Sequence, residues 1–170
     1  MEVPDYPKPG ISFKDITPLL QDPVALRRLL DQLTASVTDN VGQIGIDKVI
    51  GAEARGFILG AALAERIGAG FIPTRKPNKL PRETVSVEYQ LEYGTDSLHM
   101  HVDAIDPGDK VLIHDDLLAT GGTAAAATKM LTEVGAEIVG YSFIVELPFL
   151  SGRDALPGAA PVFSLFSFDS

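Results

Sequence analysis

The sequence has 170 residues, which suits one compact domain, residues 1–170, and leaves too little chain for two. Hydrophobic residues make up 45% and charged residues 22%, so the composition argues against a disordered or fibrous protein, and the lack of cysteine excludes disulfides and Cys-ligated zinc. The formal net charge of -9 argues against nucleic-acid binding, because such binding depends on Lys and Arg neutralising phosphates.

No apolar run approaches the ~20 residues that a membrane span needs, and the opening residues MEVPDYPKPG lack the regions of a secretion signal. We therefore expect no membrane association and a location in the cytoplasm. The basic residues are unevenly distributed: the stretch RKPNKLPR, residues 75–82, holds four of the 14 Lys and Arg. In an acidic protein this cluster indicates either a site for a small polyanion or a solvated loop.

The first regular element is expected after the Pro-rich opening, as a helix over residues 22–40. Asp22 suits the N-cap position and Pro23 the first turn. Apolar residues then recur with the helical period and predict a buried stripe made of Leu26, Leu29, Leu30, Leu33 and Val37.

Short apolar runs then alternate with helical stretches along the chain. Strands are predicted at residues 48–52, 71–75, 110–114 and 138–147, and helices at 57–68 and 123–135, with a turn at 53–56 and a loop at 115–122. Repeated strand, helix, strand units imply right-handed crossovers. The predicted fold is therefore α/β, with a central mostly parallel sheet flanked by helices on both faces.

An antiparallel hairpin is predicted between the two α/β units. Residues 84–94 and 97–102 alternate strictly around a Gly-Thr-Asp turn at 94–96, with one side apolar or aromatic and the other carrying Glu88 and Glu92. We expect this hairpin to form a flap over a ligand site.

The stretch VLIHDDLLATGGT, residues 111–123, carries the strongest functional signal. Asp115 and Asp116 follow an apolar strand. Small residues, whose backbone N–H groups are left accessible, then lead into a helix N-terminus, which binds anions readily. Taken singly, Asp116 or Thr123 could equally cap the helix. The stretch lacks the Gly-Lys-Ser/Thr of a Walker A loop, and the chain has no G-x-G-x-x-G.

This stretch resembles the phosphoribosyl-diphosphate (PRPP) motif of the type I phosphoribosyltransferases. The resemblance implies that fold and a PRPP site. Asp115 and Asp116 would hold the ribose hydroxyls, and Asp115 would also stabilise positive charge on the ribose carbon. The 5'-phosphate would be wrapped by Ala119, Thr120, Gly121, Gly122 and Thr123.

Flanking segments resemble the adenine phosphoribosyltransferases in particular. DYPKPGISFKDITPLL is similar to their N-terminal base-binding segment, which implies that residues 1–20 form it, and YQLEYGTDSL is similar to their flexible hood, here about 78–104. EARGF and RKPNKLPRET resemble two further ligand loops. The implied reaction converts adenine and PRPP to AMP and diphosphate, in purine salvage.

The resemblance also implies roles for single residues. Phe13 would stack on the purine and the backbone near Ser12 would address its edge, although many members are apolar where Ser12 stands. Glu92 would move the proton at the base, unless it is a solvated carboxylate. Three basic residues would meet the diphosphate side, namely Arg55, Arg75 and Lys79.

Mg²⁺ is the implied cofactor, held mainly by PRPP and water, with no metal ligand assigned among the side chains. A homodimer is implied as well, in which Arg75 reaches the second subunit's site. Two alternatives stay open: a related enzyme acting on another purine, and a PRPP-sensing regulator without turnover.

The histidines have no role from the resemblance. His99, His101 and Asp103 alternate along one strand, so they form either a solvated face or a metal site. His114 stands where the family is usually apolar, and it is either a core imidazole that perturbs Asp115 or a side chain that points away from the ligand.

Overall fold

The fold is built around a five-stranded sheet in the order β4-β3-β7-β8-β9, in which every pair of neighbours is parallel. The computed structural model describes residues 1–5, 13–90 and 95–169. The strands are β3 (Lys48–Ala52), β4 (Gly70–Thr74), β7 (Lys110–Leu118), β8 (Glu137–Glu146) and β9 (Val162–Ser167). The predicted α/β class with a parallel sheet is confirmed.

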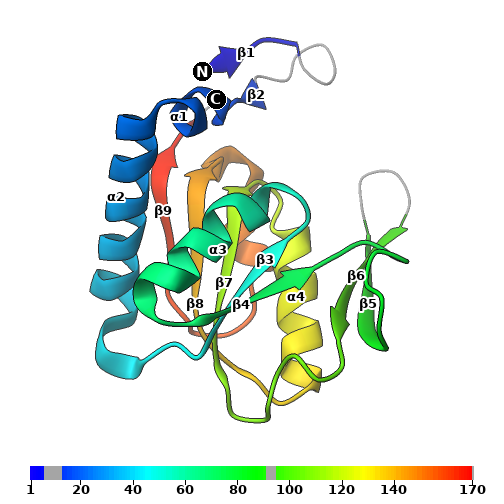
Figure 1. The fold of residues 1–170 in the computed structure, drawn as a ribbon. Helices are drawn as coiled ribbons and strands as arrows, with labels where there is room; N and C mark the ends of the chain where they lie inside the picture. The colour runs from blue at the N-terminus through cyan, green and yellow to red at the C-terminus, as the bar shows by residue number, and fades with distance from the viewer. Residues whose placement is uncertain (6–12, 91–94, 170) are drawn as a thin grey trace.

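Helices cover both faces of this sheet (Figure 1). The helices are α2 (Pro23–Val41), α3 (Arg55–Ile67) and α4 (Gly122–Glu133). Successive strand residues point to opposite faces: Leu112 packs with residues of α2 and α3, such as Leu33 and Leu59, whereas Ile113 packs with residues of α4, such as Met130. The core therefore has two apolar layers, one on each side of the sheet.

The first long helix begins as its sequence predicts. The Asp22 carboxylate accepts hydrogen bonds from the backbone N–H groups of Val24 and Ala25, both at 2.8 Å, and so caps α2. Three residues of the predicted stripe are buried, namely Leu29, Leu33 and Val37, while Leu26 and Leu30 are only partly buried.

The two helices that follow β3 and β7 end at the glycines expected. Gly68 caps α3 with φ 73°, and Gly135, with φ 86°, follows the end of α4. The prediction is wrong at the start of α3, because the helix begins at Arg55, inside the segment expected to be a turn. The turn between β3 and α3 is thereby reduced to two residues.

The strand that carries the acidic pair is longer than predicted. Residues 115–118 were expected in a loop, but they continue β7, because the neighbouring β8 extends equally far and pairs with them, Asp115 opposite Phe143 and Leu118 opposite Glu146. The connection from β7 to α4 is therefore only 119–121. The carboxylates stand on a paired strand, which fixes their backbone.

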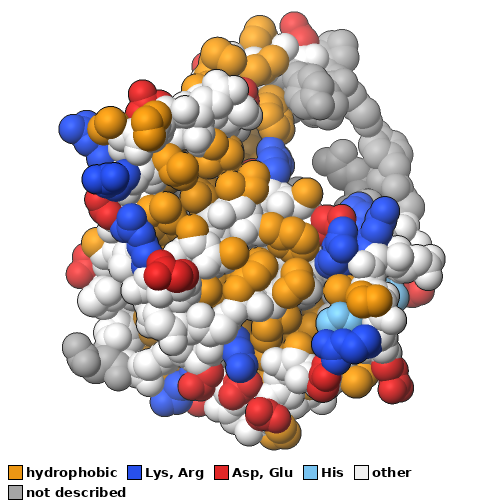
Figure 2. All heavy atoms as spheres, in the orientation of Figure 1, with side chains coloured by type: hydrophobic (Ala, Val, Ile, Leu, Met, Phe, Trp, Pro, Cys, Tyr) orange, Lys and Arg blue, Asp and Glu red, His pale blue; other side chains and the backbone are white. Residues whose placement is uncertain are grey.

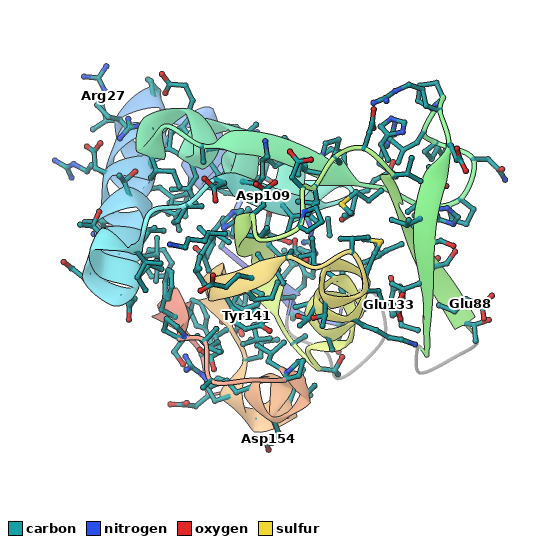
Figure 3. All side chains as sticks on the ribbon, turned by 90° about the horizontal axis from the view of Figure 1, so that it is seen from below. Arg27, Glu88, Asp109, Glu133, Tyr141 and Asp154 are labelled. Atoms are coloured by element: carbon teal, nitrogen blue, oxygen red, sulfur yellow. The ribbon has the colours of Figure 1, made fainter. Side chains whose placement is uncertain are left out.

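The predicted hairpin is present as β5 (Thr84–Gln90) paired antiparallel with β6 (Thr95–His101). The turn prediction at 94–96 is wrong, because Thr95 and Asp96 already pair with Gln90 and Tyr89 in the two strands. Residues 91–94, which link the strands, lie outside the described residues. Figure 3 shows the hairpin beside α4, with Glu88 projecting away from that helix.

Several short elements were not predicted. They are β1 (Glu2–Val3), which pairs antiparallel with β2 (Phe13–Lys14), α1 (Thr17–Gln21), and three 3₁₀ turns at Gly42–Ile44, Pro148–Leu150 and Gly152–Ala155. The edge strand β9 was missed as well. Figure 1 places β1 and β2 beyond the carboxyl ends of the sheet strands. In the described part of the chain no helix is long and apolar enough to cross a membrane.

Candidate functional site

A pocket of about 200 Å³ lies where β7 ends and α4 begins. Its lining brings together most of the residues expected to hold PRPP: Arg55, Asp115, Asp116, Ala119, Thr120, Gly121, Gly122 and Thr123. This is the carboxyl edge of a parallel sheet, where ligands of open α/β folds bind. Phe143 of β8 also lines the pocket, and sequence reasoning missed it. Parallel pairing of β8 with β7, where Phe143 lies opposite Asp115, is the signal that could have found it.

The loop of residues 119–121 shapes the pocket's anion-binding side. Gly121 is the N-cap of α4 and has φ 78°, a left-handed conformation that favours glycine. Neither Asp116 nor Thr123 occupies the cap position, so that simpler interpretation of the motif is wrong. The first N–H groups of α4 have no partner within the helix and lie beside the pocket, as an anion site requires.

Both carboxyls of the adjacent pair have raised pKa values, so the pair is not fully ionised near neutral pH. Asp116 is 5% exposed and Asp115 is partly exposed, and the backbone N–H of Asp116 donates to Oδ1 of Asp115 at 2.9 Å. Burial, together with the neighbouring charge of Asp116, raises the pKa of Asp115 to about 8. Burial also raises the pKa of Asp116, with Arg55 opposing the shift. Without a ligand the pair therefore carries less than two negative charges.

Arg55 connects the acidic pair to the N-terminal segment. As the first residue of α3, it places its Nε 3.0 Å from Oδ2 of Asp116. Its guanidinium carbon lies 5.2 Å from the centre of the Phe13 ring, within cation–π range. Arg55 lines the pocket, and the Phe13 ring lies beside this arginine.

The basic cluster expected to meet the diphosphate lies apart from this pocket. Arg75, directly after β4, makes a two-point ion pair with Glu53, at 2.9 Å and 3.3 Å, and donates to the carbonyl of Lys79 at 2.9 Å. Neither Arg75 nor Lys79 is part of the pocket lining. Figure 2 shows the Lys and Arg side chains gathered where β4 leads into the hairpin.

Among the described residues of the hairpin, Tyr89 approaches the pocket near Thr123. Its hydroxyl donates to Oδ2 of Asp96 at 3.5 Å, and burial raises the pKa of that hydroxyl. The remaining two expected residues, Ser12 and Glu92, lie outside the described residues.

His114 is part of the core and does not line this pocket. It is 1% exposed, its Nδ1 is 3.3 Å from Oγ of Ser142, and its ring faces Gly60 of α3. Nε2 is buried and, within the described residues, has no hydrogen-bond partner. Burial lowers the pKa of His114 to about 4, so the imidazole is neutral at physiological pH.

His99, His101 and Asp103 do not form a metal site within the described parts of the chain. The expectation that all three share one strand is wrong, because β6 ends at His101 and Asp103 lies in the turn that follows. The two ring nitrogens of His99 lie 3.3 Å from Oγ1 of Thr84 and 3.1 Å from Oγ of Ser97. Asp103 forms an ion pair with Arg82. These side chains already have protein partners.

Comparison with known proteins agrees with this geometry. The profile of the phosphoribosyl transferase domain matches residues 20–154. The adenine phosphoribosyltransferase of Alkaliphilus metalliredigens is 56% identical over 156 residues, which is 92% of this chain and 89% of the relative. That of Solibacter usitatus is 55% identical over 168 residues, 99% of this chain and 94% of the relative.

Solved structures of the same enzymes share the fold. The adenine phosphoribosyltransferase of Rhodothermus marinus superimposes with a TM-score of 0.89 at 50% identity, covering 99% of this chain and 93% of that one. The Saccharomyces cerevisiae enzyme, solved with an imino-altritol bisphosphate and adenine, gives 0.92 at 39% identity, covering 97% and 93%. With its acidic pair and small-residue loop set at the carboxyl edge of the same fold, the chain belongs to the adenine phosphoribosyltransferase family.

Proposed function

We propose that this protein transfers the phosphoribosyl group of PRPP to adenine and releases AMP and diphosphate, a reaction of purine salvage. The observation that carries the proposal is the pocket at the end of β7, where two carboxylates meet the amides of a helix N-terminus. The yeast relative, whose solved structure holds adenine, supports adenine as the base.

The pocket suits the ribose 5'-phosphate half of PRPP. Asp115 and Asp116 would each accept hydrogen bonds from a ribose hydroxyl, which gives the adjacent carboxylates separate partners. The backbone amides and Thr hydroxyls of residues 119–123 would bind the 5'-phosphate. A carboxylate at Asp115 would also stabilise the positive charge that develops on the ribose carbon as diphosphate leaves.

The base is proposed to bind beside Phe13. Its ring would stack on adenine, and the backbone near Ser12 would address the purine edge. The purine nitrogen that attacks the ribose must lose its proton, and we propose that Glu92 of the hood accepts this proton. Closure of the hood would exclude water from the activated sugar.

Basic side chains are proposed to receive the diphosphate. Arg55 already reaches Asp116 and would extend to the diphosphate side, where Arg75 and Lys79 would add charge. Arg75 is paired with Glu53, so it would have to exchange that partner for a phosphate. Arginine suits this exchange because its planar guanidinium can donate two hydrogen bonds to a phosphate as well as to a carboxylate.

Mg²⁺ fits the pocket as an ion held mainly by PRPP and water. Mg²⁺ prefers oxygen ligands and often uses one or two carboxylates beside substrate phosphates, and Asp115 and Asp116 supply such groups. Within residues 1–5, 13–90 and 95–169 no group of three or more His, Cys, Asp and Glu could hold the metal alone. Bound with PRPP, the ion would neutralise charge on the departing diphosphate.

We also propose a homodimer, with Arg75 serving the second subunit's site, and a cytoplasmic location. Val24 of α2 and Ile58 of α3 are 58% and 49% exposed. Figure 2 shows further hydrophobic side chains over the face formed by these helices. Light scattering should give twice the mass of one chain, 18.1 kDa. A mass that stays at one chain would refute the dimer.

The base specificity can be tested with the purified protein, Mg²⁺, PRPP and five bases: adenine, hypoxanthine, guanine, xanthine and orotate. Adenine should be the preferred substrate. If adenine is inactive while another base turns over, the protein belongs to a different activity class of the same superfamily.

A further inference from the structure

The loop of residues 119–121, called here the phosphate loop, packs against a segment that lies outside the pocket. Residues 148–155, which contain two 3₁₀ turns, follow β8 at its carboxyl end (Figure 1). The N–H of Leu147 donates to the carbonyl of Leu118 at 3.0 Å. A Cβ on Gly121 would lie 2.3 Å from the Gly152 carbonyl oxygen, and one on Gly152 would lie 2.2 Å from the Ala119 carbonyl oxygen. The two segments thus meet backbone to backbone.

An ion pair between Arg153 and Glu146 links this backing segment to the sheet. Nε and Nη2 of Arg153 donate to Oε1 and Oε2 of Glu146 at 2.6 Å and 2.7 Å. Arg153 also donates to the carbonyl of Val162 at 2.7 Å, and Ser164 donates to Glu146 at 2.6 Å. The pair therefore connects the end of β8, the second 3₁₀ turn and the edge strand β9.

Glu146 is held in a defined position by these contacts. It is 5% exposed, and both of its oxygens have partners. Hydrogen bonds from Arg153 hold the pKa of Glu146 below its usual range, so the carboxylate is charged throughout the neutral range. Two-point Arg–carboxylate contacts restrict geometry more than a single contact does.

We propose that Glu146 and Arg153 are positioning residues for the 5'-phosphate of PRPP, acting through the backbone of residues 152 and 119–121. The proposal rests on the proposed PRPP site. Neither residue lines the pocket, so neither touches the substrate. Their contribution is to hold the loop so that its amides converge on one phosphate before the ligand arrives. Such preorganisation reduces the cost of ordering a loop on binding.

The decisive experiment compares Arg153→Met with the wild-type protein in steady-state kinetics and in calorimetric binding of ribose 5-phosphate. We expect KM for PRPP and Kd for ribose 5-phosphate to rise about tenfold or more, because small displacements of positioning groups have large effects. KM for adenine should stay within about twofold in the same measurements. Arg153→Lys keeps the positive charge but cannot make the two-point contact of a guanidinium. It should give an intermediate rise in KM for PRPP and in Kd for ribose 5-phosphate.

Two control variants separate positioning from general stability. Arg66→Met breaks the ion pair with Asp31 that joins α3 to α2 away from the pocket. Asp154→Asn alters the exposed neighbour of Arg153, which points away from the sheet in Figure 3. Both should leave KM for PRPP unchanged, whatever they do to the melting temperature.

A role confined to stability would lower the melting temperature of Arg153→Met with KM and Kd unchanged, and that result would overturn the proposal. If Arg153→Met does not fold, Ser164→Ala removes only one hydrogen bond to Glu146, and Gly152→Ala disturbs the loop with the ion pair intact. Unchanged Kd for ribose 5-phosphate in both would equally refute it. Because that Kd needs no base, it tests the proposal even if the wild-type protein fails to use adenine.

Discussion

Arg55 and Asp116 are joined by an ion pair of 3.0 Å that connects the start of α3 to the end of β7. The same guanidinium lies 5.2 Å from the centre of the Phe13 ring, so one side chain contacts both the acidic pair and the N-terminal segment. The order of the sheet makes this possible, because β3, which precedes α3, lies directly beside β7. The site is therefore assembled from elements that are distant in sequence and adjacent in space.

Replacing either aspartate of the pair should weaken ribose binding. In Asp115→Asn and in Asp116→Asn one carboxylate acceptor is lost, and we expect KM for PRPP to rise and turnover to fall. A hydrogen bond to a charged group contributes about 1.5–3 kcal/mol, which corresponds to roughly tenfold or more in affinity. Steady-state kinetics with PRPP as the varied substrate measures the effect. Unchanged PRPP kinetics in both variants would rule out the assignment.

Binding of PRPP should release a proton. The pKa of Asp115 is raised to about 8 in the ligand-free protein, so at pH 7.5 this carboxyl is largely protonated. Ribose hydroxyls that donate to it favour the charged form and lower that pKa. Calorimetric titrations at pH 7.5 in buffers of different ionisation enthalpy measure the release.

Asp115→Asn is the control for this proton, because an amide cannot supply it. The variant should release clearly fewer protons per PRPP than the wild-type protein. Equal release by both would show that the proton comes from elsewhere.

The local part of the site was predictable from the sequence. Asp115, Asp116 and the loop to Thr123 are contiguous, and a strand that leads through small residues into a helix has few ways to fold. Arg55 was expected near the pocket only from the resemblance. Its contact with Asp116 depends on the neighbouring positions of β3 and β7, which the strand pattern alone does not determine.

The missed features depend on tertiary contacts. Two adjacent carboxylates predict the end of a strand. β7 nevertheless continues through them, because β8 provides backbone pairing partners as far as Glu146. Phe143 joins the pocket for the same reason. The contact between Gly152 and the phosphate loop could not be predicted from the sequence around Gly152. A glycine in any loop would give the same local pattern. Such features require knowledge of which strands are neighbours.

Glu92→Gln should chiefly lower kcat, by roughly 10²-fold or more if this carboxylate takes the proton of the base. Glu88→Gln is a matched control, because Glu88 belongs to the same polar side of the predicted hairpin and projects away from α4 (Figure 3). It should keep kcat close to that of the wild-type protein. Near-normal kcat in Glu92→Gln would make Glu92 a solvated surface residue.

His114 should make the folded state sensitive to acid. Burial lowers its pKa from 6.5 to about 4, so the unfolded chain binds more protons than the folded one between these values. The free energy of unfolding therefore falls as the pH falls through this window. From pH 7 to pH 5 the wild-type protein should lose roughly 2 kcal/mol more than His114→Asn in urea unfolding. An equal loss in both proteins would contradict a buried neutral imidazole.

The central claim is that this chain joins adenine to the sugar of PRPP. The most direct measurement is product analysis of the purified protein with Mg²⁺, PRPP and adenine, with AMP and diphosphate quantified separately over time. We expect both products in equal amounts, with no reaction when adenine is omitted. Saturable binding of PRPP without formation of AMP would contradict the claim and identify the protein as a PRPP-binding regulator.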